Sequence, residues 1–304
     1  MIRLGTRASV LAQAQARSVA ACLIAAGSPV EVVPMRTEGD RLVDARLAAL
    51  GGKGLFVREI EEALLGGAID VAVHSLKDLP AALPDGLSLA AFPEREDARD
   101  VLVSRAAGGF EQLREGAAVG TSSPRRRAIA LALRPDLKIE PLRGNVDTRL
   151  RKLESGGLEA IILAAAGLRR LGLSPAHATP LAPDVFVPAV GQGVLAVEAR
   201  SDDARTLAAL RVLDHGPTRT CALAERAFLA RLGASCVTPM AAHARLDGAI
   251  VRMAAIVASE DGRRVLRASV AGAPETAAAL GRRLADDLLA RGAADVAALN
   301  PVGR

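Results

Sequence analysis

The sequence predicts an α/β protein with two lobes of related design and a smaller C-terminal α+β domain. Three observations support this class. The first two thirds of the chain alternate short apolar runs, typical of buried strands, with longer segments of helical periodicity. A strand-to-helix corner with the sequence Gly-Thr occurs twice, at Gly5-Thr6 and at Gly120-Thr121. Beyond Pro217 one long helical segment precedes three strand-like runs and a final helix, which is the order of an α+β domain.

The first lobe is expected to combine three strands with two helices. Gly27 ends the first helix and Gly66-Gly67 ends the second, because glycine commonly follows a helix C-terminus. The second and third strands are rich in valine and other apolar residues and are expected to be buried parallel strands. The expected elements are strands at 2–5, 30–34 and 69–73 and helices at 9–26 and 55–65.

The second lobe is expected to follow the same order. Ser123 can cap a helix, and Pro124 suits the first helical position, where a missing N–H costs nothing. Val146, Leu150 and Leu153 fall on one face of the next helix. The expected elements are strands at 117–120, 137–140 and 160–163 and helices at 124–134 and 145–155.

Domain boundaries are expected near residues 93–103 and 200–217. If a strand at 194–199 returns to the first lobe, the chain crosses between the lobes twice and forms a two-strand hinge. The third domain is expected to contain helices at 218–232 and 274–291 and strands at 240–245, 250–257 and 264–270. The predicted domains are a first lobe at 1–96, completed by about 194–213, an arginine-rich second lobe at 97–193, and a third domain at 216–304.

Composition argues against several classes of protein. The 304 residues carry a net charge of +5 and include five phenylalanines but no tryptophan or tyrosine. Nucleic-acid binding that depends on base stacking is therefore disfavoured. No uncharged apolar run is long enough to span a membrane, and no secretory signal is visible. Because the three cysteines also form no CxxC pair, we expect a cytoplasmic protein that binds neither nucleic acid nor membrane.

The most informative segment places five arginines beside two expected helix starts: Arg125, Arg126, Arg127, Arg143 and Arg149. A helix N-terminus offers free backbone N–H groups and a positive dipole end, and guanidinium groups mounted there attract carboxylates or phosphates. A solvated basic helix face is the alternative. Against it, Arg125 and Arg126 lie in the first turn, where a cation opposes the helix dipole. An anionic ligand explains this placement, and the same reasoning applies to Arg7 and Ser9 at the first strand-to-helix corner.

A second candidate segment, 74–80, follows an apolar strand, at the position where open α/β sheets bind ligands. Lys77 supplies a cation for a ligand anion, and Asp78 supplies a carboxylate that can face a cationic intermediate or exchange protons. A solvated loop with a local ion pair is the alternative. His74 is expected to orient the loop, because no partner at metal-ligand spacing accompanies it. We expect no metal site.

Two further segments are candidates for chemistry or motion. Cys236 lies in a loop of small residues and can be an exposed thiol available for covalent chemistry. Cys22 and Cys221 sit in helical patterns and are expected to be packing residues. The glycine-rich run 51–54, which includes Lys53, is expected to form a flexible lid loop.

Taken in order, these segments resemble the porphobilinogen deaminase family, also called hydroxymethylbilane synthase. Any one motif is weak, but the ordered set is specific and runs over nearly the whole chain. The matching segments are 5–9 (GTRAS), 51–56 (GGKGLF), 74–80 (HSLKDLP), 120–126 (GTSSPRR), 142–146 (LRGNV), 188–193 (PAVGQG) and the loop of Cys236. Ser235 and Pro124 stand where the family usually has Gly and Leu, and both residues are compatible with the local turn and helix-start geometry.

The resemblance implies both a fold and an activity. The fold has three domains, of which the first two resemble the lobes of periplasmic solute-binding proteins. The activity is that of a transferase in tetrapyrrole (haem and porphyrin) biosynthesis, which condenses four porphobilinogen molecules head to tail with loss of ammonia and then releases hydroxymethylbilane by hydrolysis. A dipyrromethane cofactor, joined by a thioether to Cys236, is expected between the lobes, and the enzyme is expected to be a monomer.

The resemblance also implies roles for individual residues. Asp78 is the expected catalytic carboxylate, which bonds pyrrole N–H groups and stabilises the cationic methylene-pyrrolenine left after deamination. The residues expected to hold the cofactor are Cys236, Lys77, Ser123, Arg125, Arg126, Arg143 and Gly144. Those expected to bind substrate are Arg7, Ser9, Arg149, Arg170 and Gln192, and those expected in the lid loop are Lys53 and Phe56.

Two other functions compete with this interpretation. A two-lobed protein that binds a small anion or effector without catalysis needs neither Cys236 nor a third domain. A nucleic-acid binder is disfavoured by the scarcity of aromatic residues and by arginines confined to strand-to-helix corners.

Overall fold

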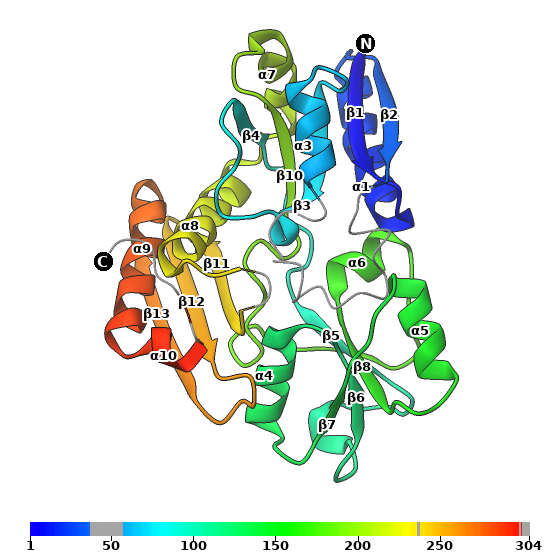
Figure 1. Cartoon of the computed structure of the whole chain (residues 1–304), viewed down its shortest axis with the longest axis vertical. Coiled ribbons are helices and arrows are strands. Elements are labelled where there is room, and N and C mark those ends of the chain that lie inside the picture. Colours follow the sequence, from blue (N-terminus) through cyan, green and yellow to red (C-terminus); the bar gives the residue numbers. More distant parts are fainter. Residues whose placement is uncertain (37–56, 236–237, 298, 300–304) are drawn as a thin grey trace.

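The computed structural model describes residues 1–36, 57–235, 238–297 and 299, and this part of the chain contains three β-sheets. Figure 1 shows the first sheet at the top, the second at the lower right and the third at the lower left. The first two sheets have five strands each, and the third has three. Two α/β lobes and a smaller C-terminal α+β domain are therefore present, as the sequence predicts.

The first lobe is a mixed sheet covered by helices on both faces. Its strands run in the order β2 (Val30–Met35), β1 (Ile2–Arg7), β3 (Val71–Ser75), β10 (Leu195–Arg200) and β4 (Leu87–Ala91). The first three are parallel, and β10 is antiparallel to both of its neighbours. Side chains of α1 (Val10–Ala25) pack on one face of the sheet, and those of α3 (Arg58–Leu65) pack on the other. Helix α7 (Ala204–Leu210) follows β10.

The second lobe repeats this topology. Its strands run in the order β7 (Lys138–Glu140), β6 (Ala118–Gly120), β8 (Ala160–Ala164), β5 (Asp100–Ser104) and β9 (Ala178–Pro180). Again the first three are parallel, and the fourth is antiparallel to both neighbours. Its helices are α4 (Pro124–Leu133), α5 (Val146–Glu154) and α6 (Ala165–Arg170). In each lobe the fourth strand in the order, β10 or β5, follows a segment in which the chain crosses over from the other lobe.

Each lobe has a glycine at a strand-to-helix corner, which lies between β1 and α1 in the first lobe and between β6 and α4 in the second. A Cβ atom on Gly5 would overlap the side chain of Ile69, and one on Gly120 would lie 2.8 Å from Cδ1 of Leu158. The serine that follows each corner caps the next helix. Ser9 accepts from the N–H of Ala12, and Ser123 accepts from the N–H of Arg126. Close packing and capping thus explain why the two lobes share this local sequence.

The third domain packs two helices against one face of an antiparallel sheet. Helix α8 (Gly216–Leu232) precedes β11 (Met240–Asp247), β12 (Ile250–Ala258) and β13 (Val265–Gly272). Phe228 of α8 and Leu284 of α9 (Ala277–Ala290) lie in the same apolar core as the sheet. The remaining short helices are α10 (Ala293–Ala297), η2 (Leu76–Asp78), η3 (Phe110–Gln112), η4 (Arg211–Leu213) and η5 (Pro274–Thr276).

Some predictions from sequence were wrong in detail. Strand β2 was expected to be buried, but none of its residues is, because it lies at a sheet edge. Cys221 is buried as expected, whereas Cys22 is exposed on the outer face of α1. Six elements were not predicted from the sequence: β4, β5, β9, α6, α7 and α10. The last residues of the expected boundary 93–103 belong to β5, and the proposed domain limits otherwise remain predictions.

A buried carboxylate on α8 joins the third domain to both crossings between the lobes. Oε1 of Glu225 accepts from Nη1 of Arg95 at 2.6 Å and from the backbone N–H of Ala244 at 2.8 Å. Oε2 accepts from the N–H of Gly191 at 2.6 Å. Burial would raise the pKa of Glu225, but Arg95 and the neighbouring His243 outweigh it and lower the pKa to about 2. The carboxylate therefore stays charged and connects all three parts of the chain.

We expect Glu225→Ala to lower the free energy of unfolding by about 3–5 kcal/mol, because it leaves the charge of Arg95 buried without its partner. Asp286→Ala is the matched control. It breaks the exposed ion pair with Arg231 on α8, which contributes about 1 kcal/mol or less. Urea denaturation measures both values, and equal losses would contradict this account of the junction.

Candidate functional site

The turn that carries Lys77 and Asp78 is fixed by the residues on either side of them. Leu76 and Leu79 are buried in an apolar cluster with Ala222 of α8. The backbone N–H of Leu76 donates to the carbonyl of Val194 at 3.0 Å. Burial of the flanking leucines leaves Lys77 partly exposed and Asp78 exposed. The two polar side chains are thus presented at the carboxyl end of β3.

Two other helices hold this turn. Nε2 of Gln15 on α1 donates to Oγ of Ser75 at 3.0 Å. The guanidinium of Arg226 on α8 donates to the carbonyls of Pro80 and Ala81, at 3.1 and 2.8 Å. Hydrogen bonds from the first lobe and from the third domain therefore hold the turn in place.

A small cavity of about 60 Å³ lies beside the turn. Its walls bring together three residues that the sequence singled out: Arg7, Ser9 and Asp78. Gln15, His74 and Ser75 also line it. The first strand-to-helix corner and the 74–80 segment, far apart in the sequence, thus form one site.

At the start of α4, Arg125 and Arg126 are buried against Asp100 of β5. Nη1 of Arg125 lies 2.6 Å from Oδ2 of Asp100, and Nη2 of Arg126 lies 2.8 Å from Oδ1. Nη1 of each arginine also donates to a backbone carbonyl at 2.9 Å, that of Val187 for Arg125 and that of Ile162 for Arg126. Burial would raise the pKa of Asp100, but the two guanidinium groups lower it to about 2.

This contact corrects the sequence-based explanation of the first-turn arginines. The anion that compensates them at the helix start is supplied by the chain itself. Asp100 was missed because it lies about 25 residues upstream, in a segment interpreted as a domain boundary. Arg127, the third arginine of the run, is exposed and does not contribute to the site.

Cations from both lobes nevertheless outnumber carboxylates around the turn. Lys77 lies within electrostatic reach of Asp78, Arg125 and Arg126, and burial lowers its pKa to about 8 although the side chain still reaches solvent. Burial, reinforced by Arg126, likewise lowers the pKa of Arg149 to about 10, while Asp78 acts against this shift. Cations held close together with their pKa values lowered favour binding of an anionic ligand.

The other expected site residues have structural contacts of their own. Nε2 of Gln192 donates to the carbonyl of Ala98 at 2.7 Å, and Nη2 of Arg170 donates to the carbonyl of Gly193 at 2.7 Å. Nε of Arg149 donates to the carbonyl of Gly144, whose φ of +113° favours glycine. Arg143 is partly buried beside Gly144, and its carbonyl accepts from Nζ of Lys152. Lys53, Phe56 and Cys236 lie outside the described residues.

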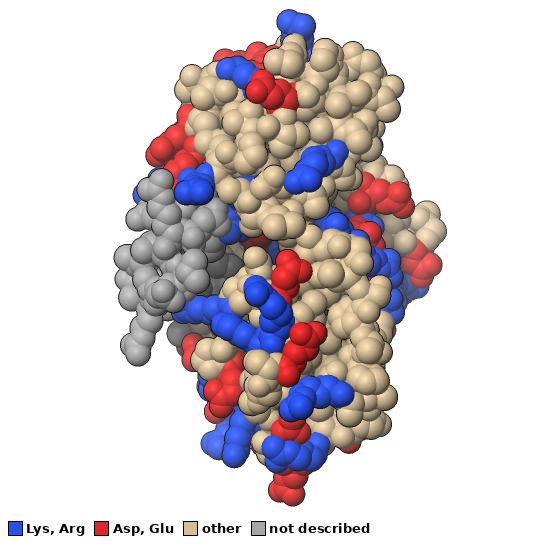
Figure 2. All heavy atoms as spheres, turned by 90° about the vertical axis from the view of Figure 1, so that its right-hand side faces the viewer, with Lys and Arg blue, Asp and Glu red and all other residues tan. Residues whose placement is uncertain are grey.

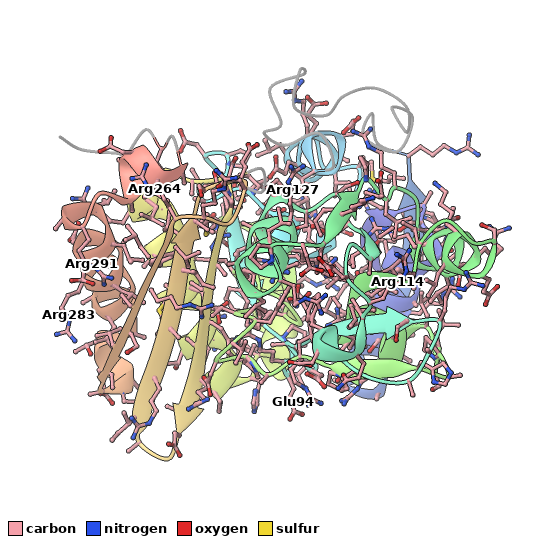
Figure 3. All side chains as sticks on the ribbon, turned by 90° about the horizontal axis from the view of Figure 1, so that it is seen from below. Glu94, Arg114, Arg127, Arg264, Arg283 and Arg291 are labelled. Carbon is pink, nitrogen blue, oxygen red and sulfur yellow. The ribbon has the colours of Figure 1, made fainter. Side chains whose placement is uncertain are left out.

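Most other arginines lie on the periphery. Five of these exposed arginines are labelled in Figure 3: Arg114, Arg127, Arg264, Arg283 and Arg291. On the face shown in Figure 2, basic and acidic side chains are interspersed. The concentration of buried cations around Lys77 is therefore a local feature and not a consequence of the overall arginine content.

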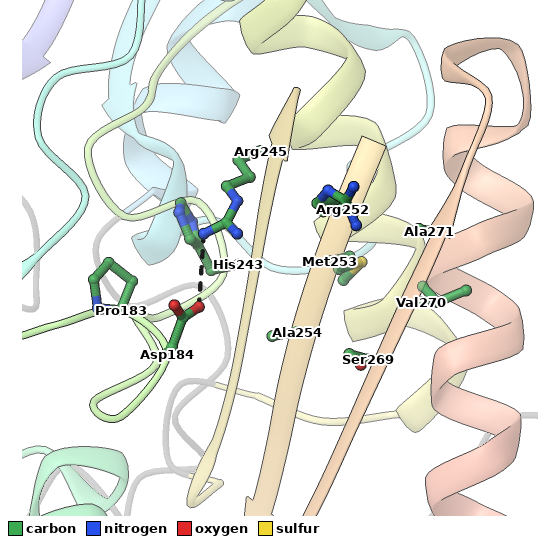
Figure 4. Close-up of a pocket in the computed structure, with 10 residues that line it drawn as sticks. All are labelled: Pro183, Asp184, His243, Arg245, Arg252, Met253, Ala254, Ser269, Val270 and Ala271. Carbon is green, nitrogen blue, oxygen red and sulfur yellow. Dashed lines mark ion pairs between the residues drawn. The ribbon is translucent and has the colours of Figure 1, made fainter. Parts of the chain in front are cut away.

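A larger cavity, of about 300 Å³, lies on the sheet of the third domain and contains none of the expected site residues (Figure 4). Arg245 and Arg252, directly opposite each other on β11 and β12, line it. Arg245 pairs with Asp184 at 3.6 Å, and Arg252 pairs with Asp247 at 3.1 Å. Because the chain's own carboxylates already neutralise both cations, we place the functional site at the turn of Asp78 instead.

Within the described ranges, no His, Cys, Asp and Glu side chains form a group able to hold a metal ion. None of the helices described is long and apolar enough to cross a membrane.

Fold and site together define a two-lobed α/β protein that gathers cations from both lobes around one exposed carboxylate. Residues 2–208 match the family model described as porphobilinogen deaminase, dipyromethane cofactor binding domain, and residues 219–290 match that of the C-terminal domain. The chain belongs to the porphobilinogen deaminase family.

Individual relatives agree with this assignment. Porphobilinogen deaminase of Syntrophotalea carbinolica is 49% identical over 96% of this chain and 93% of its own length. That of Acidithiobacillus ferrooxidans is 51% identical over 97% and 96%. A periplasmic substrate-binding protein of Coxiella burnetii superposes with a TM-score of 0.43 at 18% identity over 70% of this chain and 92% of that one. The comparisons do not favour a binding protein without catalysis.

We expect Asp100→Asn to destabilise the fold by about 3–5 kcal/mol at neutral pH, because two buried guanidinium groups lose their counter-charge. The pH dependence has a defined sign. Since the folded pKa of Asp100 is lowered to about 2, its contribution is present above the ordinary aspartate range and is lost as pH falls through about 2.

Chemical denaturation at neutral pH and acid unfolding of the wild type measure these two effects. Glu115→Gln, which removes an exposed carboxylate of the same lobe, should leave the unfolding midpoint unchanged. An Asp100→Asn protein as stable as this control would show that the contact with Arg125 and Arg126 is dispensable.

Proposed function

We propose that this chain is a transferase of tetrapyrrole biosynthesis that condenses four porphobilinogen molecules head to tail. Each condensation releases ammonia, and hydrolysis finally releases hydroxymethylbilane. One observation carries the proposal beyond family membership. The carboxylate of Asp78 faces a small cavity with Arg7 and Ser9 and lies within electrostatic reach of Arg149 and Lys77.

The cations suit the chemistry of the substrate. Every pyrrole unit carries an acetate and a propionate, so a growing chain accumulates negative charge. Arg7, Ser9 and Arg149 are the proposed contacts for those groups near Asp78, with Arg170 and Gln192 further along the site. Each charge-assisted hydrogen bond to a carboxylate contributes about 1.5–3 kcal/mol.

Asp78 has the role that arginines cannot perform. Loss of ammonia from the substrate leaves a cationic methylene-pyrrolenine, which guanidinium groups repel. A carboxylate at the same place stabilises that cation and can accept pyrrole N–H bonds. It can also accept the proton that leaves the pyrrole carbon when the new carbon–carbon bond is complete.

The residues around the turn fit the dipyrromethane cofactor that this family binds. The fit rests on the cations around Lys77, whose pKa values are lowered and which outnumber the carboxylates among the described residues. We propose that the following residues hold the cofactor, with Cys236 as its point of covalent attachment: Lys77, Ser123, Arg125, Arg126, Arg143 and Gly144. When bound, the cofactor supplies the pyrrole carbon to which the first substrate is joined.

Within this set Arg125 and Arg126 contribute charge more than hydrogen bonds. Most of their N–H groups already donate to Asp100, to backbone carbonyls and to Oε1 of Gln192. Asp100 neutralises one of the two positive charges. The other remains to attract cofactor carboxylates, which reach the more accessible donors of Lys77 and Arg143.

The enzyme is further proposed to work as a monomer in the cytoplasm. Arg7 and Asp78 line one cavity, and Arg149 of the same chain lies within electrostatic reach of Asp78. Two cysteines, Cys22 and Cys221, are free thiols, which agrees with a reducing compartment. Size-exclusion chromatography with light scattering tests the oligomeric state.

The intact mass of the purified protein tests cofactor attachment. We expect an addition that corresponds to two linked pyrrole units in the wild type and no addition in Cys236→Ala. Cys22→Ala, which removes an exposed cysteine, should keep the addition. An unmodified and inactive wild-type protein from cells that make the cofactor would refute the proposed function.

Replacement of Asp78 separates binding from catalysis. We expect Asp78→Asn to retain the mass addition while kcat falls by about 10²-fold or more, the usual cost of losing a proton-transfer or charge-stabilising group. Asp85→Asn, at a nearby exposed position, should leave kcat unchanged. Full turnover by Asp78→Asn would exclude the role assigned to this carboxylate.

A further inference from the structure

Behind the turn of Asp78 lies a group of three buried titratable side chains. His74 of β3 and Glu198 of β10 are in contact, with Nε2 of the imidazole 3.1 Å from Oε2 of the carboxylate. Their side chains are only 3% and 0% exposed. Glu61 of α3 is also buried and lies within electrostatic reach of both. The reaction proposed above uses none of the three.

The register of the sheet places all three between the sheet and α3. Ala72 and His74 point to the same face of β3, since side chains alternate along a strand. Ala72 packs with Ile60 and Leu64 of α3, whereas Val71 and Val73 pack on the opposite side with α1. Glu198 shares its face with Ala196, which pairs with His74. The cluster thus sits in an otherwise apolar layer.

An apolar layer restricts the charge that the cluster can carry. Oε1 of Glu61 and Oε1 of Glu198 are buried and have no hydrogen-bond partner in the described part of the chain. Burial first, and the charge of Glu198 second, raise the pKa of Glu61, while His74 acts in the opposite direction. Two ionised carboxylates beside one imidazole would leave an uncompensated buried charge, which is costly.

The cluster is continuous with the reactive turn. His74 lines the same cavity as Ser75 and Asp78. Just beyond it, Ser75 pairs with Leu195, and the N–H of Leu76 donates to Val194. His74 therefore lies at the end of β3, two residues before the turn begins.

Other groups face the cluster from the surrounding elements. Burial lowers the pKa of Arg226 on α8, and the charge of Glu198 partly opposes this shift. From α1, the neutral side chain of Gln15 binds Ser75. Lys77 and Asp78 lie on the turn itself. Among these groups, Arg226 is the cation whose pKa is affected by Glu198. Its guanidinium also donates hydrogen bonds to the carbonyls of Pro80 and Ala81.

We propose that the buried cluster of Glu61, His74 and Glu198 positions the turn of Lys77 and Asp78, with Glu61 held as the neutral acid. Glu198 is the direct partner of His74, and the proton on Glu61 spares the apolar layer an additional negative charge. All three are positioning residues, because none touches the reacting atoms. The catalytic part of this inference rests on the proposed function of Asp78.

The neutral state of Glu61 has a measurable consequence. Its folded pKa is raised above the unfolded value, so the folded protein binds more protons than the unfolded chain between these two pKa values. Stability therefore falls as pH rises from the ordinary glutamate range through the raised pKa. Glu61→Gln, which mimics the protonated acid, should remove this part of the pH dependence of the unfolding temperature.

The first arm of the test measures unfolding temperature against pH for the cofactor-loaded wild type, Glu61→Gln and Glu62→Gln. Glu62 is the exposed neighbour on α3, and its replacement should leave the wild-type pH dependence intact. A Glu61→Gln protein that is less stable at every pH, with the pH dependence retained, would overturn the proposal. This arm needs no turnover, so it remains decisive if the proposed reaction is wrong.

The second arm measures kcat and KM across pH for Glu198→Gln. We expect the mass addition to be retained, KM to change little and kcat to fall by about 10- to 100-fold, because a small displacement of Asp78 misaligns the reacting groups. Glu198→Asp should recover part of the loss. An unchanged kcat and pH profile in Glu198→Gln would show that the cluster does not position the turn. If that variant does not fold, the unfolding arm still decides the protonation of Glu61.

Discussion

The carboxylate of Asp100 holds two buried guanidinium groups at the start of α4, and the anion-binding site depends on that contact. Two arginines in the first turn of a helix would otherwise oppose the helix dipole and lose their hydration without compensation. One carboxylate between them makes the arrangement stable while leaving part of the positive charge. Lys77 of the other lobe adds to this charge across the site. The protein therefore keeps cations partly desolvated before any ligand arrives, which strengthens their attraction for carboxylates.

Four carboxyl groups differ in charge and role because their surroundings differ. Asp100 and Glu225 are fully buried and balanced by arginines, so both remain ionised and structural. Asp78, at the cavity, is exposed and is not used as a counter-ion by a buried arginine in the described residues. It is the carboxylate that we propose meets the substrate. Glu61 is buried near another carboxylate, which favours its protonated form. Burial and the nearest cation thus decide which acid is structural and which is reactive.

Sequence patterns revealed much of the fold and the site, but mainly where the signal is local. The caps at Ser9 and Ser123, Pro124 at the first helical position and the apolar face of α5 were all predicted correctly. The partner of Arg125 and Arg126 was not, because Asp100 reaches them only through strand pairing between distant segments. Glu61 and Glu198 gave no signal, since their contact with His74 exists only after the sheet and α3 have packed. The placements of Lys53, Phe56 and Cys236 remain predictions from the family pattern.

The exchange of strands between the lobes also affects how the chain is made. Strand β10 lies between β3 and β4 and pairs with both. It leaves the ribosome roughly one hundred residues after β4, which takes about 5–20 s at ordinary rates of translation. During that interval the nascent N-terminal lobe has an unpaired sheet edge at β3, the kind of edge that promotes association between chains. The same strand exchange that links the two lobes thus leaves the incomplete polypeptide open to association with other chains until β10 has been made.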